Sequence, residues 1–363
     1  MRNAVRWAGS AAIASIALVS SSPRESTAIG APTAPPSVSF PRDHGSHPDA
    51  AVEWWYYTGH LTDAAENVCG FQLTFFRVGE LHLAHLAWTD SSAGTFFYEE
   101  KAHLGLPGIA SAQVGRLAVS NEDWSAEETG GVHRLRAGRR NWELRLTLRP
   151  AKPPVLHGSE GISRKGSGED EYSHYVSITR LEAVAQLRQP DRRRELTGTA
   201  WFDHEWGPGA LPAGAQGWDW FGVQLSDGSD LMLYRLRGTD GRATPFSAGT
   251  LVPEKGPPVP IRWSDVRFSE TKTWVSPHTR ARYPAGWEIA VPSLDLRLAI
   301  APLLSDQELI TEKSTGVTYW EGACRVAGSR AGRAVTGRAY AELTGYAGRD
   351  VPGFPATNRV EEP

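Results

Sequence analysis

The sequence predicts an all-β protein whose antiparallel sheets close into barrels or pack face to face. Short segments rich in β-branched and aromatic residues recur along the chain, and Gly, Pro, Asn and Asp separate them. No helical hydrophobic stripe is longer than about two turns. Many short strands at regular spacing are typical of closed or sandwiched sheets.

The first set of strands is expected at residues 53–58, 71–77, 82–89, 95–100, 141–149, 172–187 and 196–204. A further strand covers 230–237, and a second set covers 266–270, 286–291, 294–299, 316–326 and 334–343. Hairpin turns are predicted at Gly130-Gly131, Asp227-Gly228 and Asp240-Gly241. Residues 150–171 are polar and Gly-rich, which predicts a mobile surface loop. The four prolines between 253 and 260 exclude a central strand there.

A length of 363 residues suits two domains better than one core. We expect the boundary near Gly238, giving domains at 40–237 and 238–363. The N-terminus has the features of an export signal: basic residues precede an apolar run at 8–19, which is shorter than the roughly 20 residues needed to span a membrane. Residues 1–30 are therefore expected to be a signal peptide and 31–39 a linker, with an uncleaved anchor as the alternative. The protein should be exported, either periplasmic or secreted.

The formal net charge of −3 gives no basic surface for nucleic acid. Cys69 and Cys324 are expected to be buried free thiols, with a disulfide as the alternative. The 14 Trp residues suit a bulky apolar ligand, although core packing explains any single one equally well.

The segment from Trp201 to Trp206 concentrates charge among large aromatic residues. Because strand side chains alternate, Trp201, Asp203 and Glu205 share one face, and Phe202, His204 and Trp206 share the other. Two neighbouring carboxyls buried among aromatics should leave one protonated near neutral pH. Such a pair is the usual apparatus for general acid–base catalysis, and a structural network is the alternative.

A second aromatic segment begins at Glu53 and places Trp55 and Tyr57 on the same face as the acid, with Trp54 on the other. A carboxyl in such a strand is costly unless it is paired, and Arg77 is the candidate partner. Other polar residues lie in aromatic strands, where core packing is the commoner explanation: Gln72, His82, His85, Trp88, Tyr172, His174, Tyr175, Trp218, Asp219, Trp220 and Gln224.

No metal or other cofactor is expected. His82 and His85 lie three apart on a predicted strand and point to opposite faces. His44 and His47 lie on a loop and could still converge with Asp203 or Glu205. The sequence contains no phosphate-binding loop, nucleophile elbow or dinucleotide fingerprint, which disfavours nucleotide-dependent enzymes and serine hydrolases.

These segments resemble the carotenoid 1,2-hydratase (hydroxyneurosporene synthase) family and its secreted relatives, often described as "predicted secreted hydrolase". The resemblance spans about residues 40 to 350. It is carried by FPRDHG at 40–45, EWWYYTGH at 53–60, FQLTFFR at 71–77, AHLA at 84–87, GTAWFDHEWG at 198–207 and GWDWFGVQL at 217–225.

The resemblance implies two tandem lipocalin-like (calycin-type) antiparallel β-barrels and an apolar ligand of terpenoid or polyketide-like character. Members of known activity add water to an isolated C=C bond without a cofactor, or guide pericyclic ring closure. Most secreted relatives have no assigned activity. A pigment enzyme of this family works inside the cell, whereas this sequence has an export signal. The difference bears on the substrate more than on the fold.

Alkene hydration needs a strong proton donor and electron-rich faces around the carbocation. Asp203, with Glu205 alongside, is the expected donor, and Glu53 or His204 would steer the water. The expected ligand-binding residues are His44, Trp54, Trp55, Tyr57, Gln72, Arg77, His85, Tyr172, His174, Trp201, Trp206, Trp218, Trp220 and Gln224.

The expected partner is a small apolar ligand, with no nucleic acid and no transmembrane segment once the signal is removed; peripheral association with the envelope stays open. The enzyme hypothesis is a hydro-lyase-like or hydrolase-like activity. Its main alternative is a non-enzymatic envelope carrier or sensor of a lipophilic ligand, and a metal hydrolase is the third.

Overall fold

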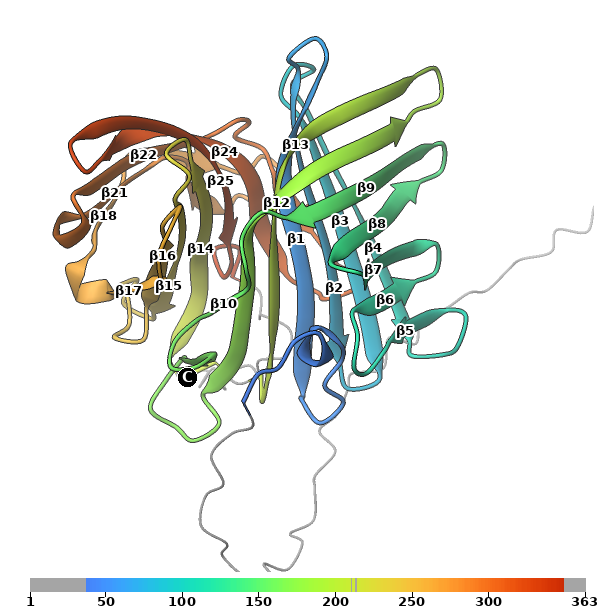
Figure 1. The fold of residues 1–363 in the computed structure, drawn as a ribbon, viewed down its shortest axis with the longest axis horizontal. Coiled ribbons are helices and arrows are strands. Elements are labelled where there is room, and N and C mark those ends of the chain that lie inside the picture. Colours follow the sequence, from blue (N-terminus) through green and yellow to red (C-terminus); the bar gives the residue numbers. More distant parts are fainter. Residues whose placement is uncertain (1–36, 210, 213, 349–363) are drawn as a thin grey trace, which may run out of the picture. The chain divides into compact units, whose positions relative to one another are not determined.

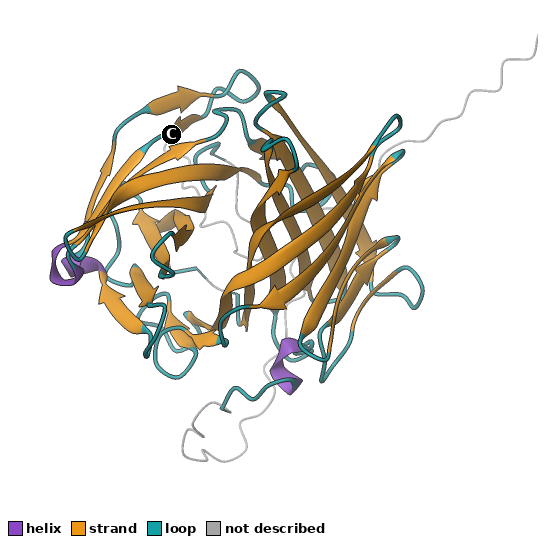
Figure 2. Ribbon diagram, turned by 45° about the horizontal axis from the view of Figure 1, so that its top comes forward, coloured by secondary structure: helices purple, strands orange, loops and turns teal. Residues whose placement is uncertain are grey.

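The computed structural model describes residues 37–209, 211–212 and 214–348. They form an all-β protein with two large antiparallel sheets, which confirms the predicted fold class (Figures 1 and 2). The first sheet is a nearly closed barrel, and the second curves in the same lipocalin-like manner. The proposed signal peptide at 1–30 lies outside the described residues, as does most of the proposed linker.

The first sheet has 13 strands in the order β4-β3-β2-β1-β13-β12-β9-β8-β7-β6-β5, with β10 and β11 paired to β12. Their bounds are β1 Val52–Asp63, β2 Val68–Val78, β3 Leu81–Asp90, β4 Thr95–Leu104, β5 Ala110–Ala112, β6 Ala118–Asn121, β7 Trp124–Thr129, β8 Val132–Arg139, β9 Trp142–Pro150, β10 Val155–Leu156, β11 Ile162–Arg164, β12 Tyr172–Arg188 and β13 Arg193–Gly207. A short 3-10 helix, η1 at Arg42–His44, precedes β1.

The second sheet has 10 strands in the order β17-β16-β15-β14-β25-β24-β22-β21-β18, with β23 paired to β24. Their bounds are β14 Ala215–Leu225, β15 Asp230–Gly238, β16 Ala248–Val252, β17 Val259–Arg262, β18 Arg267–Glu270, β21 Trp287–Val291, β22 Leu296–Pro302, β23 Glu308–Ile310, β24 Thr318–Arg330 and β25 Arg333–Leu343. β19 (Thr273–Val275) and β20 (Arg282–Pro284) form a separate hairpin, and η2 (Trp263–Asp265) and η3 (Pro292–Leu294) are single 3-10 turns.

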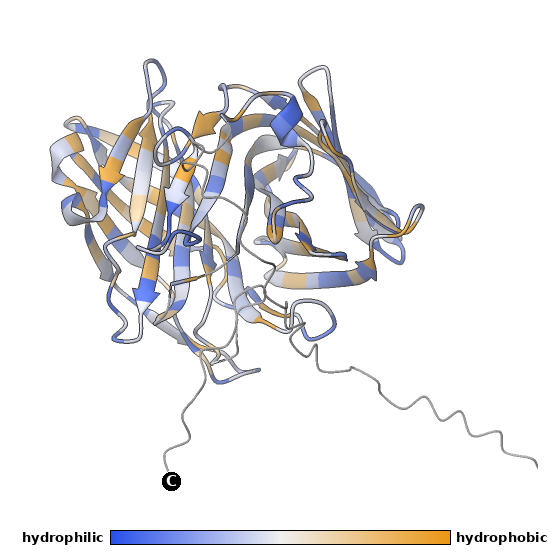
Figure 3. Ribbon diagram, turned by 90° about the horizontal axis from the view of Figure 1, so that it is seen from below, coloured by the Kyte–Doolittle hydropathy of each residue, from blue (hydrophilic) through white to orange (hydrophobic). Residues whose placement is uncertain are grey.

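Strands at the meeting of the two sheets are buried on both faces. In β1, Trp55 and Tyr57 pack into the core of the first barrel, whereas Tyr56 packs into a separate cluster with Trp220 of β14 and Tyr340 of β25. Figure 1 shows the β1, β12 and β13 side of the first sheet facing β14, β24 and β25 of the second. Figure 3 shows polar and apolar residues alternating along many strands, as expected of sheets.

Close backbone approach and buried ion pairs join the sheets. Gly70 lies where β2 meets β24, and a Cβ atom at this position would lie only 2.4 Å from the Cβ of Ala323. Arg180 of β12 donates to the carboxylate of Asp230 in β15, and Lys152 lies 2.7 Å from the same carboxylate. These contacts hold the polar residues between the sheets in a fixed geometry.

The chain changes from the first sheet to the second between β13 and β14, earlier than Gly238, and the domain boundary proposed there stays a prediction. Residues 150–171, expected to be a surface loop, instead contribute β10 and β11 to the first sheet. Cys69 and Cys324 are both buried and free, as the first expectation had it. No helix among the described residues is long and apolar enough to cross a membrane.

Candidate functional site

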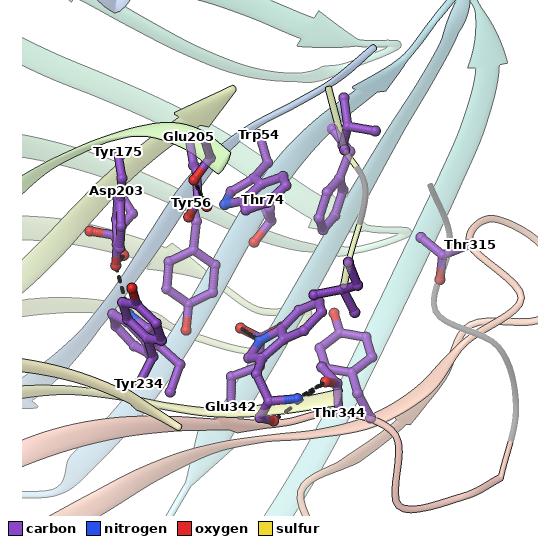
Figure 4. Close-up of a pocket in the computed structure, with 18 of the residues that line it drawn as sticks. Trp54, Tyr56, Thr74, Tyr175, Asp203, Glu205, Tyr234, Thr315, Glu342 and Thr344 are labelled. Atoms are coloured by element: carbon purple, nitrogen blue, oxygen red, sulfur yellow. Dashed lines mark hydrogen bonds between the residues drawn. The ribbon is translucent and has the colours of Figure 1, made fainter. Parts of the chain in front are cut away.

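A cavity lies between the two sheets, and its lining residues come from both (Figure 4). β1, β2 and β3 contribute residues such as Trp54, Thr74 and His85. β12 and β13 contribute a second group that includes Asp203, and β14, β15, β24 and β25 close the other side. The cavity therefore lies between the sheets rather than inside either barrel.

Asp203 is a buried acid held by three hydrogen bonds. It is 3% exposed and accepts hydrogen bonds from Tyr175 Oη at 2.7 Å, from Trp201 Nε1 at 2.6 Å and from Ser177 Oγ. Burial raises the pKa of Asp203 from 3.8 to about 7, although these three hydrogen bonds act in the opposite direction. Near neutral pH the acid and its conjugate base are therefore both populated.

Glu205, two residues further along β13, has a different environment. Its Oε1 lies 3.0 Å from Lys165 Nζ and accepts a hydrogen bond from Ser173 Oγ at 2.5 Å. Burial lowers the pKa of Lys165, but Glu205, Tyr234 and Asp203 together outweigh burial, and the net direction is upward. The Lys165 ammonium also lies 4.5 Å from the ring centroid of Tyr234. The pair combines a carboxyl at 205 that lies against an ammonium group with a carboxyl at 203 whose pKa lies near neutrality.

The second sheet supplies two further acids. Glu321 of β24 and Glu342 of β25 are register partners, and both line the cavity. Glu321 Oε1 accepts a hydrogen bond from Tyr56 Oη at 2.6 Å, and Glu342 Oε2 accepts one from Trp218 Nε1 at 3.1 Å. Burial raises the pKa of Glu342 to about 7 and holds that of Glu321 well above its ordinary value.

The rest of the cavity wall is mainly aromatic or aliphatic. Among the lining residues of this kind are Val52, Trp54, Phe76, Val78, Leu83, Trp206, Leu211, Trp218, Trp220, Leu236 and Val317. His85 also lines the cavity; burial lowers its pKa to about 3, so its ring is neutral near pH 7. Such walls suit an apolar ligand, and the clustered acids provide its polar contacts.

The structure gathers only part of the predicted site at this cavity. Of the expected catalytic residues, Asp203 and Glu205 line it. Of the expected ligand-binding residues, those that line it are Trp54, Gln72, His85, Tyr172, Trp206, Trp218 and Trp220. Trp201 lies behind the wall, where it donates to Asp203.

The other predicted residues lie elsewhere. Trp55 and Tyr57 belong to the core of the first barrel, and His44 stacks on Phe40 at a centroid distance of 4.3 Å. The ring of His174 stacks on Trp206. The side-chain amide of Gln224 donates to two carbonyl groups of the first sheet. None of these residues lines the cavity in the part of the chain that is described.

Glu53 and His204 lie on the opposite face of β1 and β13 from the cavity, because their positions alternate with those of Trp54 and Asp203. Glu53 is fully buried, and Arg77 Nε donates to its Oε2 at 3.2 Å, which confirms the predicted partner. Neither side chain can steer water toward a ligand beside Asp203 from this face.

Glu53, His47 and His204 form a cluster whose ligand atoms all lie within 4.8 Å of one another. A divalent cation would find three suitable donors here. However, Glu53 Oε1 already lies 2.8 Å from His47 Nδ1 and 3.0 Å from His204 Nε2. Ser46 and the cationic Arg77 bond to Oε2. This arrangement favours a hydrogen-bonded network that fixes the segment before β1.

Sequence reasoning missed the cavity residues Lys165, Glu321, Glu342 and Tyr234. Lys165 was hidden in a polar segment that was expected to be a loop. The two glutamates had a usable signal, since each interrupts a strand of apolar residues in the same way as Glu53.

The family model described as AttH-like matches residues 31–346 of the chain. A crystal structure of a candidate AttH from Nitrosomonas europaea shares 35% sequence identity with a TM-score of 0.79, covering 87% of this chain and 99% of that chain. Kievitone hydratase from Nectria haematococca shares 15% identity with a TM-score of 0.70, covering 85% of this chain and 93% of that chain, and so shares the fold. No curated protein matches the sequence.

Proposed function

The chain belongs to the AttH-like family, and from this premise we propose that it is a cofactor-free acid–base enzyme that adds water to a C=C bond of an apolar substrate. The observation that carries the proposal is Asp203, a buried carboxyl on the cavity wall whose pKa is raised to about 7. A general acid is most effective when its pKa lies near the working pH.

The proposed reaction begins with transfer of the Asp203 proton to one alkene carbon. The electron pair of the C=C bond forms the new C–H bond and leaves a carbocation at the other carbon. Trp54, Trp218 and Trp220 offer electron-rich faces to this cation. The conjugate base of Asp203 keeps its hydrogen bonds from Tyr175, Trp201 and Ser177, which stabilise the developing negative charge.

Water then attacks the cation, and its surplus proton returns to the Asp203 carboxylate. The product is an alcohol and the acid is regenerated, so the cycle needs no oxidant or reductant. Lys165 keeps a positive charge beside Glu205, which makes Glu205 the carboxylate that can accept a hydrogen bond from the incoming water. The name of kievitone hydratase, which shares the fold, agrees with this class of reaction.

The test is incubation of the purified protein with a panel of terpenoid and polyketide-like alkenes in isotopically labelled water. Mass spectrometry should detect the gain of one labelled water in at least one compound. Asp203→Asn should abolish this gain and keep ligand affinity within roughly a few-fold, because it removes the proton but not the shape of the pocket. Glu182→Gln, which changes an exposed acid of β12, is the matched control and should retain activity.

A non-enzymatic carrier predicts a different result. A compound would bind and co-purify unchanged, and Asp203→Asn would alter only affinity or stability. That outcome, across the panel, would refute the hydratase proposal.

The proposal includes export to the periplasm or the medium. Its support is the basic and apolar N-terminal pattern of the sequence. N-terminal sequencing of the protein from the culture medium or periplasmic fraction should find a start near residue 31. A mature protein that retains Met1 in the cytoplasm would contradict it.

A further inference from the structure

The cavity wall contains more acidic than basic groups. Asp203, Glu205, Glu321 and Glu342 all line it, whereas Lys165 is the one Lys or Arg among its described lining residues. If all four carboxyls were ionised, three negative charges would have no cation partner in a largely apolar space, which is strongly unfavourable. Since Lys165 pairs with Glu205, the other acids favour the protonated form, in which a carboxyl can donate a hydrogen bond.

Glu342 differs from its register partner Glu321 in access to the cavity. The Glu342 side chain is partly exposed, whereas that of Glu321 is fully buried. Trp218 Nε1 holds Glu342 Oε2, and no described residue forms a hydrogen bond with the other oxygen, Oε1. Glu342 is therefore a carboxyl fixed at one oxygen and open at the other.

The surroundings of Glu342 offer little that could satisfy this open oxygen. Glu321 uses Oε1 to accept the hydrogen bond from Tyr56, and its buried Oε2 has no partner among the described residues. Trp218 and Trp220 are the large neighbouring walls from β14. In Figure 4, Glu342 lies across the cavity from Glu205 and Trp54. A purely hydrocarbon ligand would cover the open oxygen without pairing it, which is unfavourable.

We infer that Glu342 binds a hydroxyl or carbonyl oxygen of the ligand, so that the substrate is an oxygenated apolar molecule rather than a pure hydrocarbon. The inference rests on the proposed function for the identity of the ligand site. It also predicts how the substrate is oriented. If Glu342 on β25 binds the oxygen, the rest of the molecule extends toward Asp203 on β13. Fixing one end of a substrate in this way is how a site selects which carbon receives the proton.

The experiment uses two probes with the same carbon skeleton, 2-acetylnaphthalene and 2-ethylnaphthalene, with affinities measured by equilibrium dialysis against the full protein. The wild type should bind the ketone about fivefold tighter or better, since one net hydrogen bond has roughly that value. Glu342→Gln should keep the preference, because the amide N–H replaces the carboxyl O–H as donor. Glu342→Leu should bind both probes with nearly equal affinity.

Glu182→Gln, at an exposed acid of β12, is the matched control and should keep the ketone preference. Asp203→Asn tests Asp203 as the alternative site for the oxygen. The inference would be overturned if the wild type bound the two probes with equal affinity or bound neither of them. It would also be overturned if the ketone preference survived Glu342→Leu. A preference that disappears with Asp203→Asn but not with Glu342→Leu would also overturn it and would place the oxygen at Asp203. The hydration test on alkenes in labelled water is scored separately, so either proposal can fail without the other.

Discussion

Trp201 donates its indole N–H to Asp203 Oδ1 over 2.6 Å, so that one residue of β13 stabilises the ionised form of another on the same face. The bond opposes burial, which alone would raise the pKa of Asp203 further. The position of this pKa near neutrality is thus a balance between desolvation and three hydrogen-bond donors.

Replacing Trp201 with Phe removes this donor and keeps most of the aromatic packing. We expect the pKa of Asp203 to rise above about 7, because a hydrogen bond that favours the carboxylate is lost. Carbon-13 NMR titration of labelled aspartate carboxyls measures the shift. Trp124→Phe, which removes an indole donor to Gly138 in the first barrel, should leave the titration unchanged. Identical titration curves for Trp201→Phe and wild type would contradict the prediction.

The raised pKa of Asp203 should also make stability depend on pH. Between about 4 and about 7 the unfolded chain has ionised this carboxyl while the folded protein still holds its proton. The folded state then binds more protons, so the contribution of Asp203 to the free energy of unfolding falls as pH rises through this window and is constant outside it. Asp203→Asn cannot titrate, so its stability relative to wild type should increase from about pH 4 to about pH 7. Urea denaturation across this range measures the difference, and a constant difference would refute the assignment.

The alternation along β13 and β1 was predictable because the strand period of two is fixed by backbone geometry. It correctly separated Asp203 and Glu205 from His204, and the pairing of Glu53 with Arg77 was also foreseen. What the pattern did not reveal was which face carries the cavity. Both faces of these strands are buried, one by the first barrel and one by the second sheet, so neither face is marked by exposed polar residues.

The residues of the far wall of the cavity could not be predicted from local sequence patterns, for a different reason. Glu321 and Glu342 line the same cavity as Asp203 only because the second sheet packs against the first. This packing also brings Glu321 to Tyr56, more than a hundred positions away in the sequence. Lys165 reaches Glu205 because residues 162–164 add a strand to β12. A charged residue within a strand of apolar residues is expected to have a partner, but the local sequence does not identify that partner.

His157 bridges the two sheets and contacts Ser177, which donates to Asp203. Its Nε2 lies 2.7 Å from Ser177 Oγ and its Nδ1 lies 2.9 Å from Thr250 Oγ1. Burial lowers its pKa to about 3, so the ring is neutral in the folded protein near pH 7. His157→Phe should destabilise the protein by about 1–3 kcal/mol at pH 7 because two buried hydroxyls each lose one hydrogen bond.

The effect of His157→Phe should shrink in acid. Below about pH 6.5 the histidine is protonated in the unfolded wild type but not in the folded protein. The free energy of unfolding of the wild type therefore decreases as the pH is lowered from about 6.5 to about 3. The variant lacks this loss. Guanidinium denaturation at pH 7 and pH 5 measures both values, and an equal or larger difference at pH 5 would contradict the neutral bridge.

The Arg180–Asp230 pair should be one of the strongest links between the sheets. Asp230 is fully buried, with Arg180 Nε at 3.1 Å, Lys152 Nζ at 2.7 Å and the hydroxyl of Thr179 at 2.9 Å. Asp230→Asn leaves two cations without their counter-charge and should cost about 3–5 kcal/mol in unfolding free energy. Glu99→Gln breaks the exposed pair with Arg139 and should cost less than about 1 kcal/mol. Chemical denaturation of both variants compares the costs directly, and a similar small loss in each would mean that packing rather than charge joins the sheets.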